Sequence, residues 1–187
     1  MKKALLLFMG IFFVYGCGPK YGIIKETQPG EDLKKYRAVS VGWLDLGPER
    51  WKTYDYESQA QWVETINHVN RNAMPDYFKK ALSKKEVSFA ASRNDAPKKD
   101  GLVIRFSEVE YVQRTSSAAK VMWGTFAGSD TLDMTMHFID GKTGKELNQM
   151  RISVYSKSTS DISGWGFEGR INNCVYNLAY IIADKVQ

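Results

Sequence analysis

An alternating stretch in the second half of the chain constrains the fold more than any other feature. Between Thr131 and Asp140, apolar residues occupy every second position, and polar residues lie between them. A period of two is typical of a β-strand with one buried face and one polar face. The apolar set is Leu132, Met134, Met136 and Phe138, and the polar set is Asp133, Thr135 and His137. Such a strand needs a partner strand and a second layer to cover its apolar side.

The partner strand follows after a short turn. Asp140–Lys145 reads DGKTGK, whose Gly and Asp residues are typical of a tight turn. The apolar residues that alternate again beyond it are Met150, Ile152 and Val154. We therefore expect an antiparallel hairpin. Upstream, residues 102–112 also alternate until their phase slips near Ser107 and Glu108, which predicts a β-bulge.

Helical spacing replaces alternation in two other parts of the chain. The first helix is expected from about Gln59, and Pro75 predicts a kink or a restart within it. Its apolar face contains Trp62, Ile66, Val69 and Ala73, followed by Phe78, Ala81 and Leu82. The second helix is expected over residues 167–185, with Ile171, Cys174, Val175, Leu178 and Ile182 on one face. Cys174 therefore belongs in the core, as a buried thiol should.

Two further short strands are predicted at residues 36–44 and 86–92. The resulting order is strand, helix, strand, three strands and helix. Helices segregated from a mainly antiparallel sheet make an α+β two-layer sandwich. We expect about 4–5 strands with two main helices packed on one face. The chain has 187 residues, which is a suitable length for one such domain.

The N-terminus indicates export. Lys2 and Lys3 precede the apolar run Ala4–Gly16, which is shorter than the roughly 20 residues a membrane-spanning helix needs. The stretch Val14–Cys17 resembles the bacterial lipobox, in which the Cys is lipidated and becomes the first residue of the mature chain. We expect a signal peptide over 1–16, a lipidated Cys and tether over 17–35, and a folded domain over 36–187.

A lipobox implies that the chain is held on a membrane through acyl chains on Cys17. Gly18 follows it, and in enteric bacteria that pattern implies the outer membrane. A plain secreted protein and an uncleaved anchor remain open alternatives. The formal net charge of +5, two units of which come from Lys2 and Lys3, is too mild to indicate nucleic acid as a partner. With Cys17 acylated, Cys174 is the one remaining thiol, so no disulfide and no thiolate metal site is expected.

The middle of the chain resembles the DUF4410 family of bacterial lipoproteins. The family pattern has a strand ending in a Tyr-containing segment, a Gly-bearing connection, an alternating strand, an Asp-x-x-Thr-Gly-x-x-Leu turn and a return strand. In this sequence the turn residues are Asp140, Thr143, Gly144 and Leu147, and the connection carries Gly124 and Gly128. The resemblance spans residues 100–154 and extends more loosely over 36–186.

The resemblance implies an anticodon-binding-like α/β sandwich. That fold is shared with the N-terminal domain of the Tol-system propeller protein and with curli-secretion pore subunits. It also implies a non-enzymatic module that binds or assembles. Together with the lipobox, the single domain leads us to expect the membrane as one partner, through the lipid on Cys17, and an envelope protein, the cell wall or a second copy of the chain as another.

The candidate catalytic residues are few. His68 and His137 are far apart in sequence, and neither has carboxylates at metal-ligand spacing. The serine-rich stretches contain no Gly-x-Ser-x-Gly, and nothing marks either histidine as an activating base. We therefore expect no enzyme activity, no cofactor and no metal.

Aromatic residues are the candidates for partner binding. They lie in the first loop, in the Gly-bearing connection and before the last helix: Trp51, Trp123, Phe126, Trp165 and Phe167. A surface platform for a glycan or a protein uses such residues, but they also cap the ends of sandwich cores. The function predicted is a membrane-anchored envelope lipoprotein with a binding or assembly domain. The alternative is an envelope hydrolase or small-ligand carrier without a recognisable motif.

Overall fold

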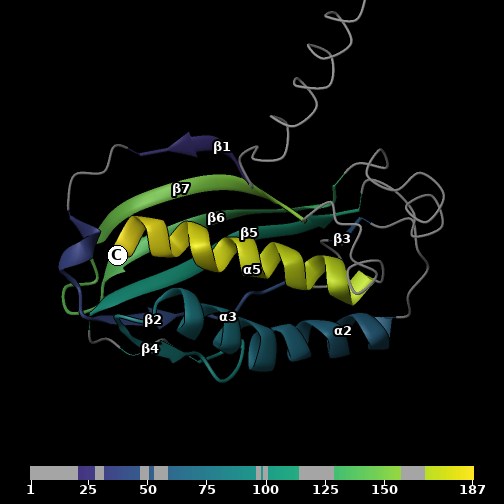
Figure 1. Cartoon of the computed structure of the whole chain (residues 1–187), viewed down its shortest axis with the longest axis horizontal. Helices are drawn as coiled ribbons and strands as arrows, with labels where there is room; N and C mark the ends of the chain where they lie inside the picture. The colour runs from purple at the N-terminus through teal and green to yellow at the C-terminus, as the bar shows by residue number, and fades with distance from the viewer. Residues whose placement is uncertain are drawn as a thin grey trace, which may run out of the picture.

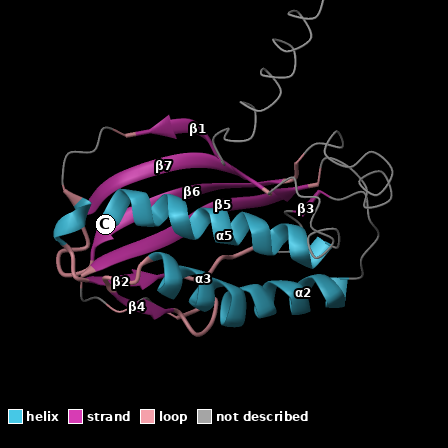
Figure 2. Ribbon diagram, in the orientation of Figure 1, coloured by secondary structure: helices cyan, strands magenta, loops and turns pink. Residues whose placement is uncertain are grey.

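In the part of the chain that the structure describes, the fold consists of one sheet and three α-helices, with a short 3-10 helix and a π-helical segment. The computed structural model describes residues 21–27, 32–46, 51–52, 59–95, 98, 101–113, 129–156 and 167–187. Within them, helices α2 (Gln59–His68), α3 (Met74–Ala81) and α5 (Phe167–Val186) lie on one face of the sheet (Figures 1 and 2). The α+β class with the helices on one face is therefore as predicted. None of the helices in these ranges combines the length and apolar character that crossing a membrane requires.

The sheet is mixed, with the order β1–β7–β6–β5–β2–β4, and β3 pairs with β5 beside this path. The strands are β1 (Tyr21–Glu26), β2 (Ala38–Val41), β3 (Trp51–Lys52), β4 (Glu86–Phe89), β5 (Leu102–Val112), β6 (Thr131–Asp140) and β7 (Glu146–Tyr155). The pairs β1–β7, β6–β7 and β5–β6 are antiparallel. The pairs β2–β4, β2–β5 and β3–β5 are parallel.

The expectation of 4–5 mainly antiparallel strands was therefore too low in number. The three long strand pairs are antiparallel as expected, whereas the three short pairs are parallel, which was not expected. The reason is the crossover through α2 and α3, which returns the chain to the edge where β2 began and makes β4 parallel to β2. The long connection from β4 to β5 similarly leaves β5 parallel to β2. Strand β3 and strand β1 are too short or too irregular to be distinguished from loops by alternation alone.

Residues 21–26 form strand β1 and were wrongly predicted to belong to a tether. Tyr21–Glu26 pairs with β7, and Leu33, in the 3-10 helix η2 (Leu33–Lys35), is buried. The ordered fold thus includes residues from Tyr21 onward, not from residue 36. The only sequence signal was the apolar pair Ile23–Ile24, which remains exposed because β1 is an edge strand.

The hairpin, the bulge and the helical faces were predicted correctly. All residues named above for the apolar faces of the strands and helices are buried. The register of β5 against β6 shifts between Ser107 and Glu110, which confirms the bulge. Ahead of Pro75, the helix widens into the π-helical segment η4 (Val69–Ala73), and α3 then begins at Met74. The core lies between the helices and the inner face of the sheet.

Candidate functional site

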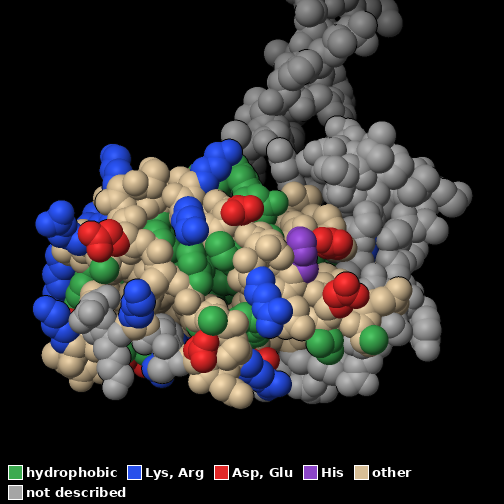
Figure 3. Space-filling model, turned by 90° about the horizontal axis from the view of Figure 1, so that it is seen from below, with side chains coloured by type: hydrophobic (Ala, Val, Ile, Leu, Met, Phe, Trp, Pro, Cys, Tyr) green, Lys and Arg blue, Asp and Glu red, His purple; other side chains and the backbone are tan. Residues whose placement is uncertain are grey.

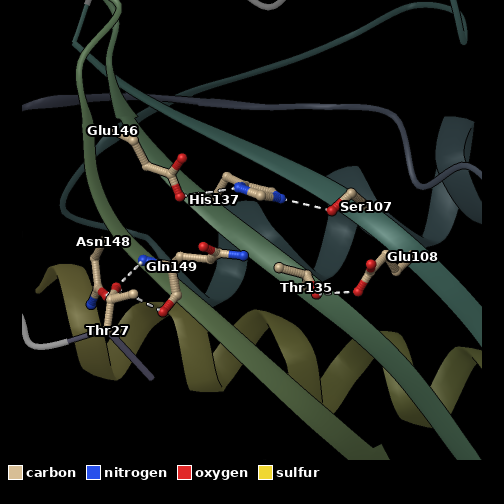
Figure 4. A network of polar contacts seen from close by, with 8 residues as sticks. All are labelled: Thr27, Ser107, Glu108, Thr135, His137, Glu146, Asn148 and Gln149. Atoms are coloured by element: carbon tan, nitrogen blue, oxygen red, sulfur yellow. Dashed lines mark hydrogen bonds and ion pairs between the residues drawn. The ribbon is translucent and has the colours of Figure 1, made fainter. Parts of the chain in front are cut away.

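The outer face of the sheet, away from the helices, carries several neighbouring groups of polar contacts. Figure 4 draws part of them. We call this set the polar face. Its members are Ser107, Glu108, Asp133, Thr135, His137, Glu146, Arg151 and Ser153, from β5, β6 and β7. The period-two polar positions of β6 supply its centre, as the sequence predicted. In antiparallel pairs, side chains on one face contact those directly opposite and diagonal to them, which explains how the contacts run across three strands.

The bulge brings Glu108 into this set. Glu108 has a φ of 51°, a left-handed conformation that is uncommon for a residue other than glycine. Its Oε2 accepts a hydrogen bond from Thr135 Oγ1 at 3.0 Å and one from Arg151 Nη1 at 2.5 Å. The bulge therefore connects all three strands through one carboxylate. Strained conformations of this kind persist where surrounding contacts hold them.

A second line of contacts crosses the same face. His137 Nε2 lies 2.7 Å from Ser107 Oγ, and His137 Nδ1 lies 3.2 Å from Glu146 Oε1. The hydroxyl, imidazole and carboxylate thus follow the order of a nucleophile, a base and an orienting acid. Sequence reasoning missed this arrangement because the bulge and the hairpin register, not sequence spacing, bring the three residues together.

The β1 edge is joined to β7 beside the polar face. Thr27 follows β1, and its Oγ1 accepts a hydrogen bond from the backbone N–H of Gln149 at 2.8 Å (Figure 4). The same hydroxyl lies 2.9 Å from Asn148 Oδ1, to which it donates. Lys185 of α5 contacts Glu26 at 2.9 Å. These contacts fix the start of the fold against both layers.

A cavity of about 320 Å³ lies beside the polar face. Arg105 and Phe106, which precede Ser107 on β5, line one side of it, and Asp45 and Arg93 line another. Asp45 and Arg93 form an ion pair of 2.9 Å. None of the residues Ser107, His137 and Glu146 lines this cavity. The three side chains lie on the open sheet surface, with His137 23% exposed and Glu146 47% exposed.

A buried polar cluster lies where β5 ends and β6 begins. Arg170 Nε lies 2.5 Å from Asp130 Oδ2, and the Tyr111 hydroxyl donates to the same oxygen at 2.7 Å. Burial, and then the Asp130 carboxylate, raise the pKa of Tyr111 well above its usual value. The cluster joins α5 to the sheet and is enclosed by protein, so its role is structural. Sequence reasoning missed it because Asp130 and Arg170 lie in different elements with no distinguishing pattern.

The predicted site residues fall largely outside the described residues. This is so for Cys17, Trp123, Phe126 and Trp165. The backbone of Trp51 lies in β3 beside Tyr111, and Phe167 begins α5; their side chains lie outside the described part. The proposed lipidation and the aromatic platform therefore stay predictions. In the described ranges, no group of three or more His, Cys, Asp or Glu residues is arranged to hold a metal ion.

Comparison with known proteins supports one family. The family model "Domain of unknown function (DUF4410)" matches residues 31–155, which is more than half of the chain. A search of curated proteins found no match. Among solved structures, the chain is similar to the PelC dodecamer from Paraburkholderia phytofirmans, with 11% identity and a TM-score of 0.46. That match covers 89% of this chain and 99% of that one.

A second solved structure is a putative neuraminyllactose-binding hemagglutinin homolog from Helicobacter pylori. Its identity is 10% and its TM-score is 0.41, and the match covers 82% of this chain and 84% of that one. At these TM-scores neither likeness carries over to binding or assembly.

Proposed function

This chain belongs to the DUF4410 family, and we propose that it is a lipid-anchored lipoprotein of the bacterial outer membrane whose domain binds a protein partner. In this proposal residues 1–16 are the signal peptide and Cys17 carries the lipid. The observation that supports the binding role is the polar face. Three strands carry paired polar side chains on the side of the sheet that no described helix covers, with Glu108, His137, Glu146 and Arg151 at least partly exposed and Thr135 and Ser153 buried.

The position of Ser107, His137 and Glu146 outside the neighbouring cavity favours a macromolecular partner. Small ligands bind in concave sites, whereas protein interfaces are broad and bury about 800 Å² on each partner. Glu108, Arg151 and Glu146 provide charges of both signs, which suits recognition by complementary charge. The contacts of Glu108 with Arg151 and of Glu146 with His137 hold these side chains in place before binding, which lowers the entropy lost on association.

Because β1 begins at Tyr21, only a short segment separates Cys17 from the folded domain. Cys17 precedes Tyr21 by four positions, which is a reach of about 14 Å at full extension. A lipid on Cys17 would therefore hold the domain against the membrane surface. The partner would then be a protein of the same membrane or of the adjacent envelope, and a second copy of the chain is included in that class.

A photo-crosslinking amino acid in the full chain tests this proposal. Placed at Gln149, between the polar face and β1, it should give a crosslinked band in intact envelopes. Placed at Glu64, an exposed position on α2, it should not. A band of twice the mass of the chain would identify the partner as a second copy. No band from position 149, together with a monomer on sizing, would contradict the proposal.

A hydrolase is the second candidate because of Ser107, His137 and Glu146. Against it, Glu146 is nearly half exposed, and Ser107 is paired within the β5–β6 ladder on an open surface. An activated serine needs a shaped, water-excluding site to stabilise the developing oxyanion. A fluorophosphonate probe distinguishes the two candidates: labelling that is lost in Ser107→Ala but kept in Ser153→Ala would establish the hydrolase.

A further inference from the structure

A second cavity, of about 610 Å³, lies at the opposite end of β5 from the buried cluster. We call it the basic pocket. It is formed where η2, the start of β2 and the β6–β7 turn meet. The residues that line it include Lys35, Tyr36, Arg37, Gly101, Asp140 and Lys142. The volume is within the range of small-ligand sites.

The pocket collects positive charge. Lys35, Arg37 and Lys142 line it, and all three are exposed. Within the described ranges, no ion pair engages Arg37 or Lys142. Nearby, Lys85 Nζ donates to the backbone oxygens of Lys34 and Tyr36, at 2.8 Å each, and adds a further cation. Figure 3 shows Lys and Arg side chains gathered at this end of the molecule, on the left of the view.

Among the described residues that line the pocket, Asp140 is the one acidic residue, and its oxygens are already engaged. Oδ2 accepts from the Tyr36 hydroxyl at 2.7 Å. Oδ1 accepts from the backbone N–H groups of Lys142 and Thr143, at 2.9 and 2.8 Å. Asp140 therefore holds Tyr36 and the β6–β7 turn in place. Its one negative charge, set against the three cations of the described lining, leaves a net excess of two positive charges.

The backbone around Gly101, which lines the pocket, is closely packed. Gly101 has a φ of 93°, and a Cβ there would lie 2.3 Å from the backbone oxygen of Ala38. The backbone N–H of Gly141 donates to the Gly101 oxygen at 2.8 Å. The absence of a side chain at Gly101 thus allows β2, the start of β5 and the β6–β7 turn to approach one another closely at this end of the sheet.

We propose that the basic pocket binds a phosphate group. Two cations from the junction of η2 and β2 and one from the β6–β7 turn suit a group with several charged oxygens. An Arg guanidinium can bind two such oxygens at once. The phosphate belongs either to a soluble phosphorylated molecule or to the headgroup of an anionic phospholipid. The site is distinct from the polar face and does not depend on the partner or the lipid proposed above.

Calorimetric titration of the full chain in a neutral detergent tests this assignment. The probes are sodium pyrophosphate and dihexanoyl phosphatidylglycerol, each at low ionic strength. The expected result is saturable binding of at least one probe, weakened about tenfold or more by Arg37→Gln. The matched control is Arg71→Gln, which removes the same charge from an exposed position on η4 and should leave binding unchanged.

The two probes separate the two sources of phosphate. Binding of pyrophosphate alone identifies a soluble ligand, and binding of the phospholipid alone identifies a headgroup site. No binding of either probe at millimolar concentration overturns the proposal. An equal loss in Arg37→Gln and Arg71→Gln also overturns it, because the attraction would then depend only on net charge.

Discussion

Arg170 and Asp130 form a buried ion pair, with 2.5 Å between Nε and Oδ2, and the two side chains are 2% and 0% exposed. The pair joins the first turns of α5 to the start of β6. Removing one partner would leave the other as an uncompensated buried charge. We predict that Arg170→Leu lowers the free energy of unfolding by about 3–5 kcal/mol.

Urea denaturation of single and double variants checks this prediction. The double variant Arg170→Leu with Asp130→Leu should be more stable than Arg170→Leu alone, because it removes both charges. Tyr111→Phe, which removes only a hydrogen bond to Asp130, should cost about 1 kcal/mol. Equal losses in all three variants would show that the ion pair has no special role.

The bulge at Glu108 predicts an unusual order of stabilities. Glu108→Ala and Glu108→Gly both lose the contacts to Thr135 and Arg151. Only glycine also relieves the φ of 51°. We predict that Glu108→Gly is more stable than Glu108→Ala by about 1 kcal/mol in urea denaturation. The reverse order, which is usual at ordinary strand positions, would contradict the geometry of the bulge.

Gly101 and Gly144 both have a positive φ, but only at Gly101 would an added Cβ clash with a neighbouring atom. Substituting each one by alanine therefore distinguishes the cost of the clash from the cost of backbone strain. A Cβ added at Gly144, where φ is 72°, would meet no atom within 4 Å beyond its chain neighbours, whereas one at Gly101 would lie 2.3 Å from the Ala38 oxygen. Gly144→Ala should therefore cost about 1 kcal/mol from strain alone. Gly101→Ala should cost about 3 kcal/mol, because the backbone must also move. Thermal unfolding of both variants provides the comparison.

The hydrogen bond from Tyr36 to Asp140 predicts a pH dependence. This bond is the largest cause that lowers the pKa of Asp140 from 3.8 to about 2, followed by the backbone N–H of Thr143. Because the folded value lies below the ordinary one, the contribution to stability is present above pH 3.8 and is lost as the pH falls through about 2. Tyr36→Phe should raise the pKa of Asp140 toward its ordinary value.

An NMR titration of the Asp140 carboxyl carbon measures that shift. Tyr155→Phe is the control, since Tyr155 is an exposed residue at the end of β7. It should leave the titration of Asp140 unchanged. An Asp140 pKa that is the same in Tyr36→Phe as in the unsubstituted chain would contradict the assigned cause.

Local periodicity predicted the parts of the fold whose burial is local. The hairpin of β6 and β7, the bulge at Glu108 and the apolar face around Cys174 all follow from spacing within one element. The parallel pairing of β2 with β4 and β5 depends on the path of the connections, and alternation does not encode it. The position of β1 was missed because an exposed edge strand has no apolar alternation.

The candidate sites were predictable to a smaller extent. The polar positions of β6 were predicted, but their partners Ser107, Glu108 and Glu146 were not, because register across strands brings them together. The basic pocket joins Arg37 to Lys142, which are distant in sequence. Such contacts follow from the tertiary fold, and no motif in the sequence signals them.

Mass spectrometry of the mature N-terminus, taken from the membrane fraction of a bacterial host, tests the lipid anchor most directly. We predict that the first residue is Cys17 and that it carries a diacylglyceryl group and an amide-linked acyl chain. We also predict that Cys17→Ala moves the protein out of the membrane fraction. A mature chain that begins at another residue, or an unmodified Cys17 on a protein recovered outside the membrane, would contradict the proposed function.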